Sequence, residues 1–281
     1  MIRDMKANVA EFRTFHAKLM AAASKSVDPR LERVFELVPR EAFLPDGPWK
    51  VMVDNRYFET PSNDPVHVYQ NVLIALDPTK GINNGEPFLH AAWIGAAAPK
   101  SGDSISHIGA GSGYYTAILS ALVVPGGQVE AFEIDPNLAA KARENLRAFE
   151  GVNVTYGDAT ELPIPPSDLI YVNAGVVAPP RSWLLALKPQ GRLIFPWRPA
   201  EKVGLAVMLT RTGTGFSAEA LMPSWFIPCV GGSPAADDAA KKPNVDEAWS
   251  IKSAWLTSDR SPDETCVAAY RNVWFSSLPL Q

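Results

Sequence analysis

The sequence predicts an α/β protein built on a doubly wound, mostly parallel β-sheet, with helices before the sheet and a β-rich extension after it. Segments with strand-like and helix-like apolar patterns alternate from about residue 103 to residue 197. A glycine-rich turn joins the first such strand to the first helix, and after Trp197 two strand-like segments follow each other directly. Strands separated by helices form parallel βαβ units with right-handed crossovers, so they indicate a doubly wound sheet.

Composition limits the function classes. The chain has 281 residues, of which 47% are hydrophobic and 20% are charged, as in a globular protein with a sizeable core. Its net charge of -4 and its lack of a Lys/Arg block argue against a nucleic-acid partner. Its apolar runs are too short to span a bilayer, and the N-terminus lacks a continuous apolar signal core. We expect a soluble, cytoplasmic protein; its oligomeric state stays open.

The region 1–80 is expected to hold N-terminal helices and a covering loop. Apolar residues recur at helical spacing in two stretches before Pro39, which predicts two amphipathic helices. Residues 43–64 are rich in Pro, aromatic and Asp/Asn residues without clear periodicity, and predict an irregular connection over the surface. The apolar positions of the two helices are Phe12, Phe15, Leu19 and Met20, then Leu31, Val34, Phe35 and Leu37.

The region 81–232 contains the alternating elements. Strands are predicted in SISHIG, QVEAFEID, NVTYGDA, DLIYVNAG and GRLIFPW, and helices in YYTAILSALV, PNLAAKARENLRAF and RSWLLALK. Pro136 stands in the first turn of its helix, a position that tolerates proline. GLAVMLTRT and FSAEALMPSWFIP, joined by a glycine-containing turn, predict a hairpin.

The region 233–281 is predicted to be a C-terminal extension. SPAADDAAKKPNVDEA is small, charged and Pro-containing, and indicates an exposed linker or loop. TCVAAYRNVWFSS alternates enough for one more strand. Cys229 and Cys266 are far apart and lack metal-ligand spacing, so we expect two buried, reduced thiols and no metal site.

The segment HIGAGSGYYTA predicts a cofactor site. Gly109, Gly111 and Gly113 lie between a strand and a helix, where backbone amides can approach a ligand at the helix N-terminus. Glu133 ends the next strand about 20 residues later, where a carboxylate can accept both hydroxyls of a ribose. Together they indicate an adenosine-containing ligand. The alternative is a tight turn followed by an ordinary charge at the end of a strand.

The glycine spacing favours S-adenosylmethionine over NAD. The pattern is G-x-G-x-G, and the bulky Tyr114 follows Gly113 where a dinucleotide fingerprint would continue. Asp158 lies just past the third strand, where a carboxylate commonly meets the adenine amino group. Asn173 follows the fourth strand, at the carboxyl edge where doubly wound sheets bind ligands.

Several of these segments together resemble the protein-L-isoaspartate O-methyltransferases over roughly residues 15–200. They are VPREAFLP, HIGAGSGYYTAIL, VEAFEIDPNLAAKARENL, NVTYGDAT, DLIYVNAGV and LKPQGRLIFPW. The resemblance implies a Rossmann-like S-adenosylmethionine-dependent methyltransferase fold that methylates a carboxylate, typically on a damaged aspartyl residue of a peptide. The cofactor-binding residues are then Ile82, Gly109, Ala110, Gly111, Gly113, Glu133, Ile134, Asp158, Ala159 and Asn173.

GINNGEPFLHA, residues 81–91, occupies the place of the family's threonine-isoleucine-serine segment, which closes over the methyl donor and touches the acceptor. Asn84 or Gly85 stands where the family has serine. His107 replaces an acidic residue that is usual two places before the first glycine. Residues 57–80 and 233–281 also exceed the compact family outline.

The missing serine does not preclude the chemistry. A carboxylate with a pKa of about 4 is already ionised near neutral pH, so methyl transfer needs alignment more than proton removal. We therefore assign the catalytic lip to Asn83, Asn84 and Gly85, because the amides can orient a carboxylate. The alternative is that this Asn-Gly segment only forms a turn.

Other residues are weaker candidates for the site. His90 is expected to pack on a helix face, and His107 is expected to support the glycine loop. The insertion offers possible acceptor-cleft residues, which are Tyr57, His67 and Tyr69.

The sequence therefore predicts an S-adenosylmethionine-dependent O-methyltransferase that acts on a carboxylate of an isoaspartyl-type peptide or protein, or of a small molecule. It needs no metal. The alternative is a cofactor-binding protein without isoaspartyl activity that acts through a partner. A nicotinamide oxidoreductase is a distant third.

Overall fold

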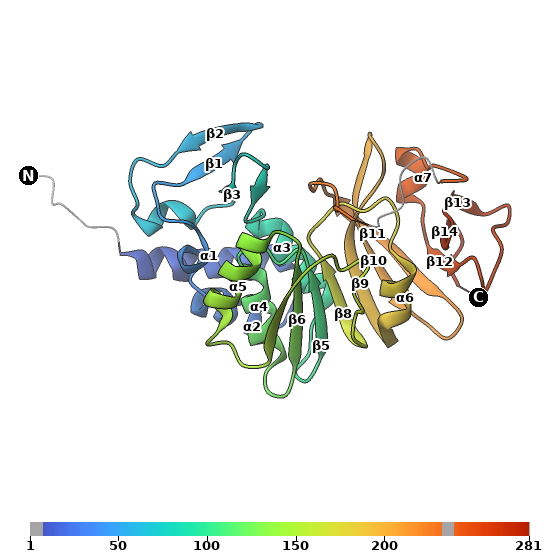
Figure 1. The fold of residues 1–281 in the computed structure, drawn as a ribbon, viewed down its shortest axis with the longest axis horizontal. Helices are drawn as coiled ribbons and strands as arrows, with labels where there is room; N and C mark the ends of the chain where they lie inside the picture. Colours follow the sequence, from blue (N-terminus) through green and yellow to red (C-terminus); the bar gives the residue numbers. More distant parts are fainter. Residues whose placement is uncertain (1–7, 232–238, 281) are drawn as a thin grey trace, which may run out of the picture.

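The computed structural model of the protein describes residues 8–231 and 239–280. Residues 1–7, 232–238 and 281 lie outside the described residues, and they include part of the predicted linker. A long β-sheet runs through the molecule, helices pack against its parallel half, and a small second sheet lies beside the N-terminal helices (Figure 1). The predicted α/β class and doubly wound sheet are confirmed.

The parallel half of the long sheet positions the site. Its spatial order in the described chain is β7, β6, β5, β8 and β9, so the order of strands reverses beside β5. Ligands bind at the carboxyl ends of the strands at such a reversal. The elements are β5 (Ser104–Ile108), α4 (Tyr114–Val123), β6 (Gln128–Glu133), α5 (Pro136–Leu146), β7 (Val152–Tyr156), β8 (Ser167–Val172), α6 (Arg181–Ala186) and β9 (Leu187–Ala200).

The predicted hairpin is confirmed. It comprises β10 (Val203–Arg211) and β11 (Phe216–Pro223), which pair antiparallel, and β10 pairs with β9. The strands beyond it continue the same sheet, because Phe216 and Ser217 of β11 pair with Ala254 and Ser253. They are β12 (Ser253–Leu256), β14 (Val273–Ser276) and β13 (Cys266–Ala269). The sheet thus extends into the region that was predicted to begin at residue 233.

Two predictions for this region were wrong. The final segment is not one strand: β13 and β14 are separate antiparallel strands joined by a turn in which Tyr270 N donates to Val273 O. The predicted loop contains the start of α7 (Val245–Trp249). The side chains of Asn244 and Glu247 each bond the other's backbone amide, which caps this short helix.

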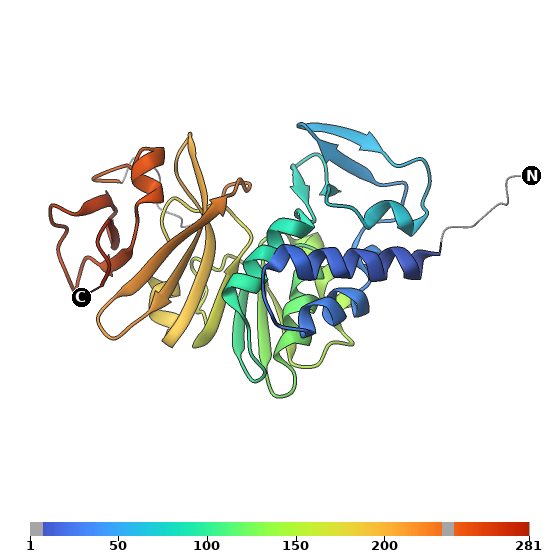
Figure 2. The same ribbon diagram turned by 180° about the vertical axis from the view of Figure 1, so that it is seen from behind.

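The two predicted N-terminal helices are confirmed as α1 (Val9–Ser24) and α2 (Arg30–Leu37). α1 contacts both α2 and α3 (Pro87–Ala97), and Figure 2 shows it lying across them on the face seen from behind. α2 in turn packs on α4. The N-terminal helices therefore form one layer over the parallel sheet.

The expectation of an irregular connection over residues 43–64 was wrong. This stretch contains the hairpin β1 (Lys50–Val53) and β2 (Arg56–Glu59), whose turn residues Asp54 and Asn55 have φ of 51° and 58°. Such positive φ values at both positions match the twist of a two-residue hairpin. The small sheet continues through β3 (Leu73–Asp77) to β4 (Ile82–Asn83), with η1 (Arg40–Phe43) and η2 (Pro65–Val68) around it.

Other sequence expectations concern the thiols and the membrane. Cys229 and Cys266 are free, but both are half-buried rather than buried as predicted. Among the described residues, no helix has the length and apolar character needed to cross a membrane. The same residues hold no group of His, Cys, Asp or Glu side chains suited to a metal ion.

Candidate active site

The glycine loop links the end of β5 to the start of α4. Gly109, Gly111 and Gly113 have φ of 77°, 57° and 98°, a region that disfavours other residues. A Cβ on Gly113 would lie 2.7 Å from Leu146 Cδ1, so a larger residue there would also have to displace the Leu146 side chain. Ala110 is buried within this turn. The loop places backbone amides at the N-terminus of α4, where a ligand with acceptor atoms can bind.

Glu133 ends β6 directly beside this loop. Its Oε2 accepts a hydrogen bond from Gly111 N at 2.7 Å, and its Oε1 accepts one from Asp135 N at 2.9 Å. Burial raises the pKa of the carboxyl, while these amide donors act in the opposite direction. The next residue, Ile134, is exposed at the same edge. The carboxylate therefore fixes the loop and lies where the sequence predicted a ribose contact.

Asp158 follows β7. Its Oδ1 accepts from Thr160 N at 2.9 Å and from Thr160 Oγ1 at 2.7 Å. A Cβ on Gly231 would lie only 1.6 Å from Asp158 Oδ2, so the backbone near Gly231 packs directly against this carboxylate. Ala159 is buried, and its carbonyl accepts from Trp183 Nε1 at 2.9 Å.

Asn173 follows β8 and is held by a buried chain of polar groups. Its Nδ2 is paired with His107 Nε2 at 2.8 Å, and His107 Nδ1 is paired with Thr116 Oγ1 at 2.8 Å. Burial lowers the pKa of His107 to about 3, so the ring is neutral at physiological pH. His107 thus orients the Asn173 amide; the hydrogen bonds of its ring go to Asn173 and Thr116 and not to the glycine loop that it was predicted to support.

These groups fit S-adenosylmethionine. Asn173 Oδ1 is buried and has no hydrogen-bond partner among the described residues, which suits a donor such as the cofactor's ammonium group. A Cβ on Gly109 would lie 3.4 Å from the backbone carbonyl oxygen of Asn173 and 3.5 Å from its Cβ, so Asn173 lies beside the glycine loop. Amide donors, two carboxylates and an unpaired acceptor therefore follow neighbouring strands at one sheet edge.

The lip predicted from GINNGEPFLHA lies between β3 and α3. Ile82 pairs with Asp77, and Asn84 N donates to Ile74 O at 2.8 Å. Asn83 Oδ1 accepts from the N–H of Gly85 at 2.9 Å, which is a side-chain turn. The Asn83 side chain and the Asn84 backbone thus take part in shaping the loop. Their contact with an acceptor stays a prediction.

Arg40 was missed as a site residue by sequence reasoning. It is completely buried, and its Nε donates to Asn84 Oδ1 at 3.0 Å. Its other donors bond four backbone carbonyls, those of Val68, Gln70, Val72 and Gly85. Its place in VPREAFLP was the available signal, since that segment carries the family resemblance. Arg40 therefore fixes the lip through its bonds to Asn84 and Gly85.

A second missed feature is the strap, defined here as residues 225–231. Gly175 N donates to Ile227 O and Cys229 N donates to Gly175 O, both at 2.8 Å. Phe226 stacks on Trp93 of α3 with ring centroids 5.3 Å apart. The strap therefore reaches from α3, past the end of β8, to Asp158. The sequence predicted only the end of a strand here.

The insertion candidates lie elsewhere in the small sheet and its surroundings. Tyr69 is buried, and its hydroxyl bonds Arg13 Nε at 2.8 Å as well as the Glu41 carboxylate. His67 Nε2 is paired with Ser62 Oγ, and Tyr57 lies on the exposed strand β2. Their role in an acceptor cleft stays a prediction.

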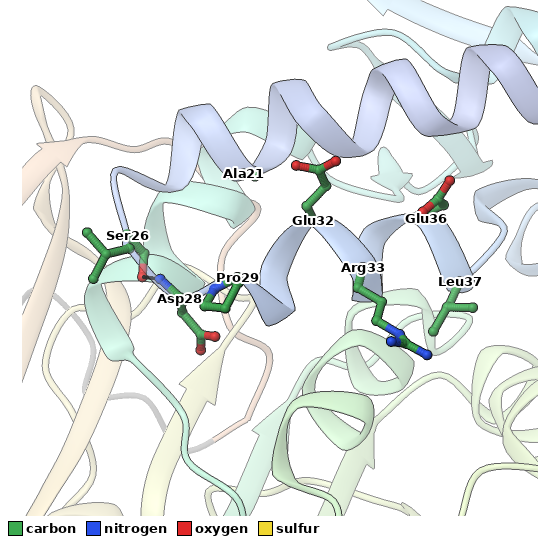
Figure 3. Close-up of a pocket in the computed structure, with 9 residues that line it drawn as sticks. Ala21, Ser26, Asp28, Pro29, Glu32, Arg33, Glu36 and Leu37 are labelled. Carbon is green, nitrogen blue, oxygen red and sulfur yellow. Dashed lines mark hydrogen bonds between the residues drawn. The ribbon is translucent and has the colours of Figure 1, made fainter.

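A surface cavity of about 630 Å³ lies between α1 and α2 (Figure 3). Its lining includes Ser26, Asp28, Glu32 and Arg33, and it contains none of the residues that surround the glycine loop. The loop with its convergent polar groups, rather than this groove, is the candidate active site.

Comparison with known proteins shows the family of the chain. The family model described as Protein-L-isoaspartate(D-aspartate) O-methyltransferase (PCMT) matches residues 17–234. A protein-L-isoaspartate O-methyltransferase of Ignicoccus hospitalis is 30% identical over 197 residues, which cover 69% of this chain and 85% of the relative. One of Methylorubrum extorquens is 30% identical over 232 residues, covering 81% and 92%.

Solved structures share the fold. A protein-L-isoaspartate O-methyltransferase superimposes with a TM-score of 0.67 at 24% identity, over 79% of this chain and 66% of that chain. A putative one from Plasmodium falciparum, in complex with S-adenosyl-L-homocysteine, gives 0.62 at 16% identity, over 77% and 97%. The family model spans most of the chain, including the glycine loop, Glu133, Asp158 and the lip. The chain belongs to the protein-L-isoaspartate O-methyltransferase family and is an S-adenosylmethionine-dependent methyltransferase.

Proposed function

We propose that the protein methylates the free carboxylate of an isoaspartyl residue in a peptide or protein. The observation that carries this proposal is the convergence of the glycine loop, Glu133, Asp158 and Asn173 at one sheet edge, where the strap packs on Asp158. S-adenosylmethionine, when bound, supplies an electrophilic methyl group. The family match favours this enzymatic function over a cofactor-binding protein that acts only through a partner.

Each group has a proposed task. The amides of the glycine loop and the Glu133 carboxylate hold the ribose and the chain of the cofactor, and Asp158 holds the adenine amino group. Ile82, Ala110, Ile134 and Ala159 border this site. Asn173 presents its unpaired Oδ1 to a donor on the cofactor. The lip and the strap exclude water and align the acceptor, which is the main requirement for an already ionised carboxylate.

The test is methyl transfer to a peptide that contains one isoaspartyl residue, with the same peptide containing a normal aspartyl residue as the matched control. Methyl esters of this kind are base-labile, and they are detected by the methanol that they release in base. We expect transfer to the isoaspartyl peptide and at most trace transfer to its control. Equal transfer to both, or cofactor binding without transfer to either, would contradict the proposal. A small-molecule carboxylate acceptor is the remaining alternative for the second result.

A further inference from the structure

His90 occupies the space next to Gly85 at the lip. A Cβ built on Gly85 would lie 2.3 Å from His90 Nε2 and 3.2 Å from Tyr115 Cε2. The Gly85 φ of 77° adds backbone strain for any larger residue. The edge of the imidazole thus fills the position that a side chain at residue 85 would need.

The ring of His90 is held in one orientation. It stacks on Tyr115 with centroids 3.7 Å apart and an interplanar angle of 18°. Phe226 of the strap meets it edge-on, and Trp93 lies beside it. Only 1% of the His90 surface is exposed. Rotation of this ring would require several aromatic neighbours to move, so Nε2 stays directed at Gly85.

The hydrogen bond between His90 and Tyr171 determines the tautomer of His90. His90 Nδ1 is paired with the Tyr171 hydroxyl at 2.9 Å, and Tyr171 is fully buried. Among the described residues the Tyr171 hydroxyl has no other partner, so its hydrogen is satisfied only if it donates to Nδ1. Burial holds the pKa of His90 well below its usual range, and the ring is neutral. Its single proton is then on Nε2.

The Nε2–H group has no hydrogen-bond partner in the described part of the chain. Nε2 is nevertheless not fully buried there, so a ligand at the lip can reach it. We propose that His90 Nε2–H is the hydrogen-bond donor that orients the acceptor carboxylate at the lip, taking the place of the family's serine, at whose position Asn84 or Gly85 stands in this chain. This inference rests on the proposed function. Tyr171 is a positioning residue, since it acts by fixing the tautomer.

A neutral donor suits this step. One carboxylate oxygen accepts from Nε2–H while the other forms the new O–C bond, as the C–S bond breaks and its electron pair stays with sulfur. No proton has to move, so His90 acts as a donor and not as a base. A neutral donor aligns the nucleophile without cancelling its charge, as a cation beside it would.

The first experiment compares His90→Gln with His90→Phe. Gln retains an N–H donor but loses the aromatic stack, whereas Phe retains the stack and loses the donor. We expect kcat/KM for the isoaspartyl peptide to fall about tenfold to a hundredfold in His90→Phe and less in His90→Gln. The affinity for S-adenosylhomocysteine, measured by calorimetry, should stay within about twofold of the parent in both. A purely structural role gives the opposite order, with Phe the milder change, and would overturn the proposal.

A second comparison introduces serine at Gly85, one of the two positions that can correspond to the family's serine. Gly85→Ser alone should be strongly impaired because its side chain meets the imidazole. His90→Ala removes that obstacle, so Gly85→Ser in the His90→Ala background should be more active than His90→Ala alone. Equal or lower activity of the double variant would count against an exchangeable donor at this position.

The parent protein provides a test that needs no variant. Nitrogen-15 NMR of labelled histidine reports which ring nitrogen carries the proton. We expect the Nε2–H tautomer, and a shift of this proton when peptide is added in the presence of S-adenosylhomocysteine. A proton on Nδ1 overturns the inference whether or not the peptide is methylated. Correct tautomer with no methylation would instead contradict the proposed function.

Discussion

Arg40 shows how one side chain organises the lip. It is fully buried, and no carboxylate among the described residues forms an ion pair with it. Its charge is stabilised by the carbonyl dipoles of the chain around η2 and by the Asn84 amide. Burial lowers the pKa of the guanidinium, but arginine stays protonated in proteins. The planar group matches five acceptors at once.

Replacing Arg40 with lysine should therefore be costly. Lysine has three donors and a flexible stem, so at least two buried acceptors would lose their partners. We expect the free energy of unfolding to fall by about 2–4 kcal/mol, as measured by urea denaturation. Arg56→Lys, on the exposed strand β2, is the matched control and should be nearly neutral. An Arg40→Lys protein as stable as the control would show that these bonds contribute little.

Glu133→Gln tests the cofactor site. The glutamine side chain places an N–H donor against one of the two backbone N–H groups that donate to the carboxylate in the parent protein. The change also removes the negative charge from the proposed ribose contact. We expect affinity for S-adenosylmethionine to fall by about 1–3 kcal/mol, measured by calorimetry. Glu130→Gln on the same strand is the control, because among the described residues the Glu130 carboxylate bonds only Asn153 and Thr155. Unchanged affinity in a folded Glu133→Gln protein would place the ribose elsewhere.

At the scale of elements, the strap connects parts of the site that are far apart in the sequence. Its backbone pairs with Gly175, and the carbonyl of its Phe226 accepts from Arg198 Nη1 at 2.7 Å. Its last described residue, Gly231, has φ of 104° and packs on Asp158. A side chain there would be strained and would also collide with the carboxylate.

Gly231→Ala should thus displace the strap from Asp158. We expect weaker binding of S-adenosylhomocysteine, by about 1–2 kcal/mol, with a small change in thermal stability because the strap lies at the edge of the fold. Gly213→Ala, in the β10–β11 turn where a Cβ would meet nothing within 4 Å, is the control. Equal cofactor affinity in the two variants would mean that the strap does not influence the cofactor site.

The elements that the sequence predicted correctly are those with a local signal. The glycine loop, Glu133 and Asp158 follow strands whose apolar patterns are strong, so spacing alone places them at one edge. Arg40 and the strap depend on contacts between distant segments, which periodicity does not report. The β1–β2 hairpin was missed because its strands are largely exposed and lack an alternating apolar face, although Asp54-Asn55 is a plausible turn pair.

At the scale of the whole molecule, the buried histidines contribute to the loss of folding stability in acid. Burial lowers the pKa of His16 to about 4 and that of His107 to about 3, and it also lowers the pKa of His90 well below its usual range. Arg40 adds to the effect at His16 by charge repulsion. Their unfolded pKa is near 6.5, so below that pH the unfolded chain binds protons that the folded protein does not.

Stability should be flat with respect to these groups above about pH 6.5 and should fall as pH drops further, by up to about 1.4 kcal/mol per pH unit for each histidine. His16→Phe removes one contribution while keeping an aromatic ring against Tyr69. Urea unfolding at about pH 8 and about pH 5 should show a smaller loss in this variant than in the parent, by about 2 kcal/mol. The same loss in both proteins would show that His16 is protonated in the folded state.

The position of the strap also has a thermodynamic consequence. It touches Asp158 through Gly231 and borders the His90 ring through Phe226, so the proposed cofactor and acceptor sites share one piece of backbone. A ligand that orders the strap lowers the conformational entropy that the second ligand must still remove when it binds. Such coupling is reciprocal. S-adenosylhomocysteine and peptide should each raise the other's affinity by the same factor, greater than one. The methyl donor would then act as a positive effector of the binding of its own acceptor.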